Sequence, residues 1–405
     1  MLKNRTIFAQ QMTRFIDTPV IKVIVGIRRC GKSYLLKLLK NHLFSLGIAE
    51  NNIISIDFES LANRDYQNFE SLYDHIMKLA GKTTGRVYIM IDEIQEVYQW
   101  EKAVRSLLVD LDCDIYLTGS NARLLSGELA TMLAGRYVEL SLLPLSFREY
   151  LDFHEIDSAN RIKVEESFND FIQYGGFPGL HLLPDDEDIK RQYLKGIFNS
   201  VVLKDIVQRH GIRDSELLER ILLYIMDNIG NIFSANRLAD FLKSQGRKVG
   251  TDSVYNYVKA LETAMIVHTV RRYDIKGKKI LERLEKYFLA DLGLRSATIG
   301  HKGSDISQIL ENVVYLELLR RGNTVYVGKE GDLEVDFVAC RDDSRHYYQV
   351  TYLLESEKTR NREFRPLLMI PDHYPKTVLS LDKLPIRGES GINQVNLIDF
   401  LLEVT

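Results

Sequence analysis

The stretch from Val20 to Leu36 constrains this chain more than any other. Its first part, Val20–Val25, is an apolar, β-branched run typical of a buried parallel strand. Residues 26–33 then match G-x-x-x-x-G-K-[ST], and the leucines that follow fit one face of a helix. Such a glycine loop turns backbone N–H groups inward, and the helix behind it presents its positive end to phosphates. The sequence therefore predicts a nucleotide site, with ATP as the ligand.

Each position of the loop has an expected task. Lys32 should reach the β- and γ-phosphates, and the Ser33 hydroxyl should bind Mg²⁺. The remaining loop residues should line the phosphates with their backbone. The residues that we expect to bind the nucleotide are Gly26, Ile27, Arg28, Arg29, Cys30, Gly31, Lys32, Ser33 and Tyr34.

A second acidic signature lies about 60 residues after the loop, where the apolar run Val87–Ile91 ends in Asp92 and Glu93. An acid at the carboxyl end of a strand can hold Mg²⁺, usually through water, and the next acid can polarise the attacking water. We assign these roles to Asp92 and Glu93. Strands often end in acids, but this spacing after a glycine loop makes the pattern specific.

Two later segments offer further catalytic candidates. The strand Asp114–Leu117 is followed by small polar residues, so Thr118, Ser120 or Asn121 could bind the γ-phosphate or position the water. Turn formation and N-capping of the next helix are the structural alternative, and both roles are compatible. Arg136 could serve a γ-phosphate in its own chain or in a neighbouring subunit, or form a structural salt bridge.

Composition sets limits on the rest of the protein. The chain has 405 residues and a net charge of −3, so any nucleic-acid binding must be local rather than global. Three widely spaced cysteines argue against a disulfide framework and a zinc site. No apolar run is long enough for a membrane span. We therefore expect a cytoplasmic protein with no membrane contact.

The motifs together resemble those of a large prokaryotic family of AAA-type ATP-binding proteins with a C-terminal domain of unknown function. The resemblance lies in the glycine loop, in 91–95 (Ile-Asp-Glu-Ile-Gln), 117–121 (Leu-Thr-Gly-Ser-Asn), 134–136 (Ala-Gly-Arg) and 145–150 (Leu-Ser-Phe-Arg-Glu-Tyr). It implies an additional-strand P-loop fold over residues 1–155, with a central strand between the two nucleotide motifs. It also implies kinship with signal-transducing ATPases with numerous domains, which act as nucleotide-gated switches. Relatives place a Gly-x-Pro turn near the adenine, which points to Pro178, although a plain turn explains that proline too.

The middle of the chain is expected to hold a helical domain (156–230) and a winged-helix domain (231–289). The predicted winged helix has two capped helices and a hairpin that turns at Gly277. Between Arg237 and Lys286 there are twelve Lys/Arg against six Asp/Glu, the local charge expected of a surface that contacts double-stranded DNA. The alternative is a winged helix that packs on the ATPase as a switch module.

Residues 290–405 resemble a restriction-endonuclease-like domain, in which carboxylates hold Mg²⁺ and a lysine assists the attacking water. Glu311 and Asp336 fit that layout, but Gln349 and Thr351 stand where a glutamate and a lysine are expected. We therefore expect a nuclease-like fold without nuclease activity. Two residues could instead restore the activity: Glu334 could act as a substitute carboxylate, and Lys358 could act as a relocated lysine.

The sequence thus predicts an α/β protein: a P-loop ATPase domain with a parallel sheet, a helical and winged-helix middle, and a nuclease-like end. The predicted function is a regulatory or DNA-associated ATPase that binds ATP, hydrolyses it slowly to ADP and acts as a nucleotide-gated switch. An ATP-dependent nuclease and a nucleotide-stabilised interaction scaffold are the alternatives. A protein partner and assembly into a homo-oligomer are compatible with each.

Overall fold

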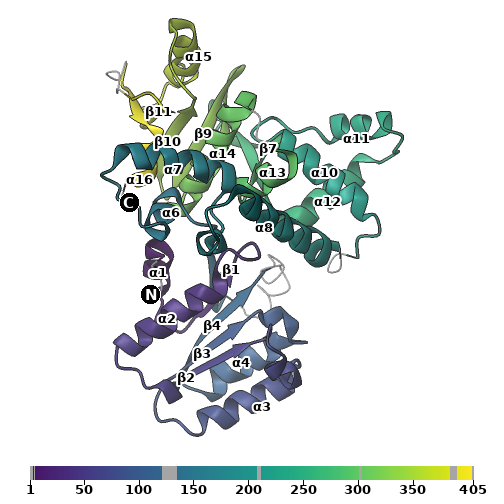
Figure 1. The fold of residues 1–405 in the computed structure, drawn as a ribbon, viewed down its shortest axis with the longest axis vertical. Helices are drawn as coiled ribbons and strands as arrows, with labels where there is room; N and C mark the ends of the chain where they lie inside the picture. The colour runs from purple at the N-terminus through teal and green to yellow at the C-terminus, as the bar shows by residue number, and fades with distance from the viewer. Residues whose placement is uncertain are drawn as a thin grey trace. The chain divides into compact units, whose positions relative to one another are not determined.

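The strand before the glycine loop, β1 (Ile21–Val25), lies inside a five-stranded parallel sheet in a computed structural model of the chain (Figure 1). The structure describes residue 3 and residues 5–120, 135–207, 211–300, 303–383 and 390–403. It divides the chain into two compact units, residues 1–143 with 263–265, and residues 144–262 with 266–405.

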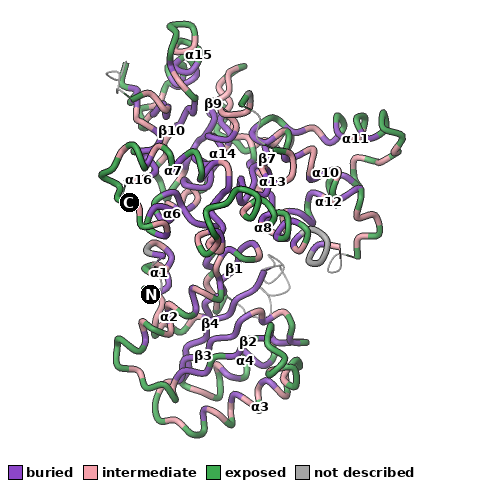
Figure 2. The backbone as a smooth tube through the Cα atoms, in the orientation of Figure 1, coloured by how far each residue is buried: buried purple, intermediate pink, exposed green. Residues whose placement is uncertain are grey.

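The sheet of the first unit has the strand order β2-β3-β4-β1-β5. Its other strands are β2 (Ile53–Asp57), β3 (Val87–Asp92), β4 (Cys113–Gly119) and β5 (Tyr137–Ser141). Because β4 lies between β1 and β3, the central strand implied by the resemblance is confirmed. All residues of β1, β3 and β4 are buried, as the purple strands in Figure 2 show.

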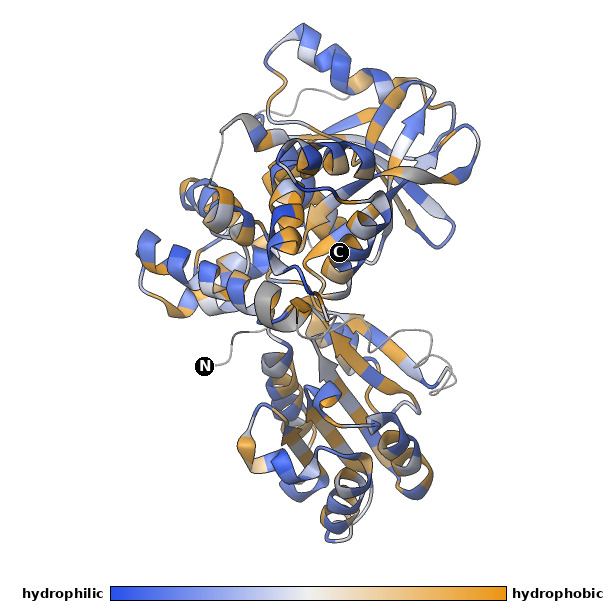
Figure 3. Ribbon diagram, turned by 90° about the vertical axis from the view of Figure 1, so that its right-hand side faces the viewer, coloured by the Kyte–Doolittle hydropathy of each residue, from blue (hydrophilic) through white to orange (hydrophobic). Residues whose placement is uncertain are grey.

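The helices of this unit are α1 (Thr6–Thr13), α2 (Lys32–Ser45), α3 (Phe69–Ala80) and α4 (Trp100–Asp110). Short 3₁₀ turns lie at η1 (Glu50–Asn52), η2 (Leu61–Tyr66) and η3 (Ile94–Glu96). Apolar residues of the strands pack with those of α3 and α4 into one continuous core, and Figure 3 colours these strands mainly as hydrophobic. Burial of this apolar surface is what holds the strand ends, and hence the loop, in place.

The second unit begins with helices. They are α6 (Phe147–Phe153), α7 (Arg161–Tyr174), α8 (Glu187–Asn199), α10 (Ser215–Asp227), α11 (Ala235–Ser244) and α12 (Thr251–Thr263), with η5 (Pro178–Leu182) and the π-helical η6 (Ser200–Val207) between them. A capping box formed by Ser146 and Glu149 starts α6. Helix α13 (Leu292–Ile299) packs against α7 and α8.

A seven-stranded mixed sheet forms the rest of this unit, in the order β12-β11-β10-β9-β8-β6-β7. Its strands are β6 (Val267–Asp274), β7 (Lys279–Leu289), β8 (Thr324–Glu330), β9 (Leu333–Arg341), β10 (Ser344–Val350), β11 (Lys376–Ser380) and β12 (Ile392–Asn396). The 3₁₀ turn η7 (Gly303–Asp305) and the helices α14 (Ile306–Arg320), α15 (Glu357–Leu368) and α16 (Leu397–Leu402) complete it.

The hairpin predicted around Gly277 is present as β6 and β7, but its strand pairing extends beyond the predicted winged-helix domain of residues 231–289. Strand β6 pairs in parallel with β8, so the hairpin forms one end of the sheet that continues through β12. The boundary predicted at residues 289 and 290 therefore falls within a unit whose sheet runs across it. Among the described residues, no helix has both the length and the apolar character needed to cross a bilayer.

Candidate functional site

The glycine loop connects β1 to α2. Gly26 has no room for a side chain, because a Cβ there would lie 2.3 Å from the carbonyl oxygen of Leu142. Gly31 has a φ of 104°, a conformation that glycine adopts without strain. The Lys32 side chain is almost fully buried, and its ammonium donates to the carbonyl oxygens of Gly26 (3.2 Å) and Ile27 (3.5 Å). The loop thus encloses the lysine that the motif predicts to face phosphates.

Asp92, at the end of β3, lies beside the first turn of α2. Its carboxylate accepts hydrogen bonds from the hydroxyls of Thr118 and Ser33. Burial raises the pKa of Asp92, and the two hydroxyls oppose that rise. Hydroxyl and carboxylate oxygens suit Mg²⁺, which commonly binds through one or two protein oxygens, water and substrate phosphates.

The described residues contain no group of three His, Cys, Asp or Glu side chains that could hold a metal ion. Ser33 and Asp92 offer a hydroxyl and a carboxylate oxygen, which suits a magnesium ion that is shared with phosphate.

Glu93 lies next to Asp92 in the left-handed region, with a φ of 53°. Its backbone N–H donates to the Thr118 hydroxyl (3.0 Å). Its Oε2 accepts from the Ser120 hydroxyl (3.1 Å) and from the side-chain amide of Gln95, and its Oε1 lies 3.7 Å from the Lys32 ammonium. The structure therefore brings Lys32 and Glu93 together at one edge of the sheet.

Small polar residues at the end of β4 contact these acids. Thr118 and Ser120 direct their hydroxyls to Asp92 and Glu93, so they position the two carboxylates. Asn121 lies outside the described residues, and its role toward the γ-phosphate stays a prediction. Gln95 was not among the predicted site residues; its place two residues after Glu93, within a 3₁₀ turn, is the signal that would have indicated it.

Arg5 is a buried contact of the loop that sequence reasoning missed. Its guanidinium is fully buried and donates to the carbonyl oxygens of Cys30 (2.9 Å) and Leu143 (2.9 Å). It also lies 5.0 Å from the ring centroid of Phe8. Cys30 itself is buried, and burial raises the pKa of its thiol. No pattern in the N-terminal residues marks this arginine, because the contact depends on two distant segments of chain.

The other loop side chains lie nearer to solvent. Arg28 is half-buried and its guanidinium lies 3.4 Å from Glu59, whereas Arg29 is exposed with a φ of 66°. The Tyr34 hydroxyl donates to the backbone carbonyl of Lys3 (2.8 Å). These side chains border the loop without entering the group formed by Lys32 and the acids.

Arg136 is not brought to the loop. It is exposed and directly precedes β5, and its carbonyl oxygen accepts from the N–H of Ile21 (2.8 Å). Because Tyr137 pairs with Ile21 in parallel register, Arg136 lies at the amino end of β1. The loop follows the carboxyl end of that strand, roughly 16 Å away for five extended residues. The geometry within this unit thus gives no support to a role of Arg136 at a γ-phosphate of the same chain.

Pro178 begins η5 in the second unit, so its predicted contact with adenine stays a prediction. The turn before it is held by Asp291, whose carboxylate accepts the N–H groups of Gly176 (2.7 Å) and Gly293 (2.8 Å). Asp291 is fully buried, and burial raises its pKa to about 7 although both hydrogen bonds favour the charged form.

The predicted nuclease residues lie together around a lysine, in a group that we call the Lys286 cluster: Lys286, Glu311, Glu334, Asp336, Gln349 and Glu363. The Lys286 ammonium lies 3.2 Å from Glu311 and 2.8 Å from Glu334. Burial alone would lower the pKa of Lys286, but the surrounding carboxylates outweigh it and raise that pKa. Burial raises the pKa of Glu311 and of Asp336. The ammonium of Lys286, on β7, therefore lies among these carboxylates and compensates part of their charge.

Gln349 lies near the end of β10, and Thr351 directly follows that strand. The side-chain oxygen of Gln349 accepts from the N–H of Asp336 (3.3 Å), and its amide donates to Glu363 (3.0 Å). Thr351 is buried, whereas Lys358 is exposed on α15. The lysine of this group is thus Lys286, which the sequence did not suggest, because it lies on β7, 25 residues before Glu311 of α14.

The basic stretch between Arg237 and Lys286 is only partly available to a ligand. Lys286 is buried in its cluster, and Arg247 donates to Asp214 (2.8 Å) and Glu216. The described cations of this stretch that are exposed are Arg237, Lys243, Lys248, Lys259, Arg271, Lys276, Lys278 and Lys279. They come from α11, α12, the turn between them and the β6–β7 hairpin.

The parallel sheet, with its glycine loop and the acids of β3, defines the P-loop ATPase fold. Residues 18–151 match a family model described as an AAA domain, and residues 165–305 match a domain of unknown function, DUF8612. A solved Walker-type ATPase of Pyrococcus abyssi has a similar fold, with a TM-score of 0.52 and 18% identity over 73% of this chain and 95% of that chain.

Two relatives are similar over most of their length. An uncharacterised protein of Haemophilus influenzae is 39% identical over 99% of this chain and 98% of its own length. An uncharacterised protein of Methanocaldococcus jannaschii is 32% identical over 94% of this chain and 85% of its own length. The chain belongs to the same family as these two proteins.

Proposed function

We propose that the protein binds ATP with Mg²⁺, hydrolyses it slowly to ADP and phosphate, and works as a nucleotide-gated switch. The observation that carries the proposal is the meeting of Lys32, Ser33, Asp92 and Glu93 at one edge of the parallel sheet. Each has the chemistry that phosphoryl transfer requires; Lys32 and Ser33 come from the start of α2, and Asp92 and Glu93 from the end of β3.

The side chains divide the reaction between them. Lys32 supplies a positive charge to the phosphates, and the N–H groups of the loop supply hydrogen-bond donors. Ser33 and Asp92 would hold Mg²⁺, which when bound neutralises charge on the phosphate oxygens. Glu93 accepts the proton of the attacking water.

The contacts of Glu93 are our reason for expecting slow turnover. Ser120 and Gln95 donate hydrogen bonds to the Glu93 carboxylate, and the Lys32 ammonium lies 3.7 Å from it, so these contacts have to be exchanged before Glu93 accepts a proton from water. A slowly hydrolysing site holds ATP long enough for its bound state to act as a signal, which suits a switch better than a motor.

Two substitutions test the site. Lys32→Ala should weaken ATP binding by about ten- to a hundredfold, because charge-assisted contacts to the phosphates are lost. Glu93→Gln should keep the affinity and lower turnover by about a hundredfold or more. Lys37→Ala, an exposed lysine on α2, is the matched control. Parental turnover in Glu93→Gln would refute the assignment of the base, and measurable binding without any turnover in the parent protein would favour the scaffold alternative.

DNA association is the second candidate function, favoured by the exposed cations of α11, α12 and the hairpin. Three helices followed by a hairpin match the layout that we propose for a winged helix, with α12 as the helix that faces the groove. We expect weak, sequence-tolerant duplex binding that falls steeply with salt. Replacing Arg271, Lys278 and Lys279 by serine should flatten the salt dependence. No binding at low salt, with or without ATP, would favour a module that only packs on protein.

We propose that the end of the chain is a restriction-endonuclease-like domain that does not cut nucleic acid. Lys286 already compensates the charge of Glu311 and Glu334, and Gln349 brings no charge to the group. For Arg136, which is exposed far from the loop of its own unit, the remaining proposal is service to a neighbouring copy in a homo-oligomer.

A further inference from the structure

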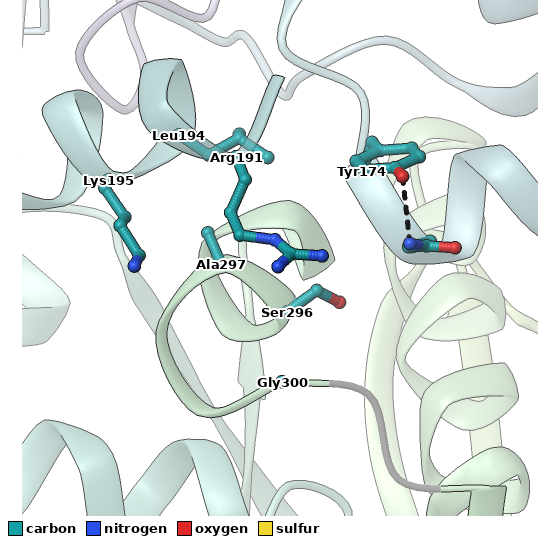
Figure 4. Close-up of a pocket in the computed structure, with 8 residues that line it drawn as sticks. Tyr174, Arg191, Leu194, Lys195, Ser296, Ala297 and Gly300 are labelled. Atoms are coloured by element: carbon teal, nitrogen blue, oxygen red, sulfur yellow. Dashed lines mark hydrogen bonds between the residues drawn. The ribbon is translucent and has the colours of Figure 1, made fainter. Parts of the chain in front are cut away.

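A cavity of about 250 Å³ lies in the second unit between α7, α8 and α13. It is lined by Gln173, Tyr174, Arg191, Leu194, Lys195, Ser296, Ala297 and Gly300 (Figure 4). The volume is slightly smaller than that of sites for drug-sized ligands, so the cavity suits a compact molecule. No predicted role of any residue involves this cavity.

Two cations of α8 line the cavity one helical turn apart. Figure 4 shows the side chains of Arg191 and Lys195 extending from α8 on the same side, with the guanidinium beside Ser296 of α13. In the described part of the chain, neither cation forms an ion pair, whereas Lys190 next to them pairs with Asp185. Like charges at this spacing repel each other and weaken a helix. An anion between them would remove that cost.

The polar and apolar groups around the cations limit the kind of anion. The Gln173 amide donates to the Tyr174 hydroxyl (3.0 Å), which fixes the aromatic side of the cavity. Ser296 contributes a hydroxyl to the lining of the cavity, and Leu194 and Ala297 contribute apolar side chains. A guanidinium can bind two oxygens of one phosphate, and the ammonium adds a point charge. Hydroxyl and apolar groups then suit a small sugar or similar body attached to that phosphate.

We propose that this cavity binds a small phosphate monoester, with Arg191 and Lys195 on the phosphate and Ser296 on the hydroxylated body. The competing explanation is structural: the carboxyl end of α13 attracts a nearby cation. That explanation accounts for the position of Arg191 but does not explain why Lys195 also lines the cavity. The proposed site is distinct from the glycine loop and does not depend on the proposed ATP hydrolysis.

The test uses the full-length chain carrying Lys32→Ala, so that the glycine loop does not compete for the probe. Ribose 5-phosphate binding is measured by calorimetry, with ribose and succinate as probes for the sugar and for a carboxylate anion. Arg191→Gln and Lys195→Gln are each added, and Lys163→Gln on α7 removes an exposed cation outside the cavity. Melting temperatures without ligand show whether each variant is folded.

We expect saturable binding of ribose 5-phosphate that weakens about tenfold or more in both cavity variants and is unchanged in Lys163→Gln. Ribose and succinate should bind at least tenfold more weakly. No saturable binding at 10 mM, equal weakening in Lys163→Gln, or succinate binding as tightly as the phosphate ester would each overturn the proposal. A lower melting temperature in Arg191→Gln alone, with ligand binding intact, would establish the structural explanation instead.

Discussion

Replacing Lys286 by methionine tests the charge balance of the second unit. The change keeps much of the apolar stem and removes the ammonium that lies 3.2 Å from Glu311 and 2.8 Å from Glu334. Lys286 and Glu311 are both buried, so the carboxylate would stay in a poorly solvated place without its cation. Breaking a buried ion pair in this way costs about 3–5 kcal/mol. For a unit of this size, that corresponds to a melting temperature lower by roughly 6–20 °C.

The pH dependence makes this prediction specific. Burial raises the pKa of Glu311 and Asp336 in the parent protein, and the loss of Lys286 removes a charge that opposes the rise. Protonated carboxyl groups are cheaper to bury, so the destabilisation of Lys286→Met should shrink as the pH falls from 7.5 to 5.5. In the parent, the stabilisation from Lys286, whose pKa is raised, is present below pH 10.5 and is lost above it.

Scanning calorimetry of the full chain at both pH values measures the effect, because the two units need not unfold together. Lys276→Met, at an exposed position of the hairpin, is the matched control. Adding Glu311→Gln to Lys286→Met should recover part of the lost stability, since the second charge is then also gone. A melting temperature within 2 °C of the parent, or a loss that does not change with pH, would refute the reasoning.

Three further predictions concern other groups. Gln95→Ala should raise ATP turnover about two- to tenfold, because Glu93 loses one hydrogen-bond donor; a steady-state rate below the parental one would mean that Gln95 positions the base productively. Asp291, with its pKa raised to about 7, should make the protein less stable as the pH rises from about 4 through 7, and Asp291→Asn should flatten that dependence of the melting temperature; an unchanged slope would contradict it. Supercoiled plasmid should stay intact with Mg²⁺ or Mn²⁺ and ATP, and cleavage that is lost in Asp336→Ala would promote the nuclease alternative.

The P-loop unit could be predicted closely because its signals are local. An apolar β-branched run is buried on both faces of a parallel sheet, and the spacing of the glycine loop and the acids sets which strands carry them. The contacts Lys32–Glu93 and Thr118–Asp92 then follow from the meeting of strand ends at one edge. Arg5 was missed because its partners, the carbonyl groups of Cys30 and Leu143, are backbone atoms without a sequence signature.

The second unit was less predictable because its key pairings are distant in sequence. The β6–β7 hairpin is encoded by local turn chemistry, but its pairing with β8 is set by packing across about 50 residues of intervening chain. Lys286 faces Glu311 and Glu334 only because that pairing forms. Its role could not be predicted from spacing, and the same holds for Gln349, whose amide contacts Glu363 on α15.

The pairing of β6 with β8 also decides how this protein can be divided for expression or fused to other modules. A fragment that stops at residue 289 would keep β6 and β7 but expose the edge of β6 that pairs with β8. A fragment that starts at residue 290 would expose the matching edge of β8. Unpaired strand edges invite association with other chains. A cut near residue 143 leaves the whole seven-stranded sheet in one fragment, so it should give better-behaved fragments than a cut at residue 289. By the same reasoning, the hairpin and its distant partner strands should be inherited as one module, because recombination that separates them leaves unpaired strand edges in both products.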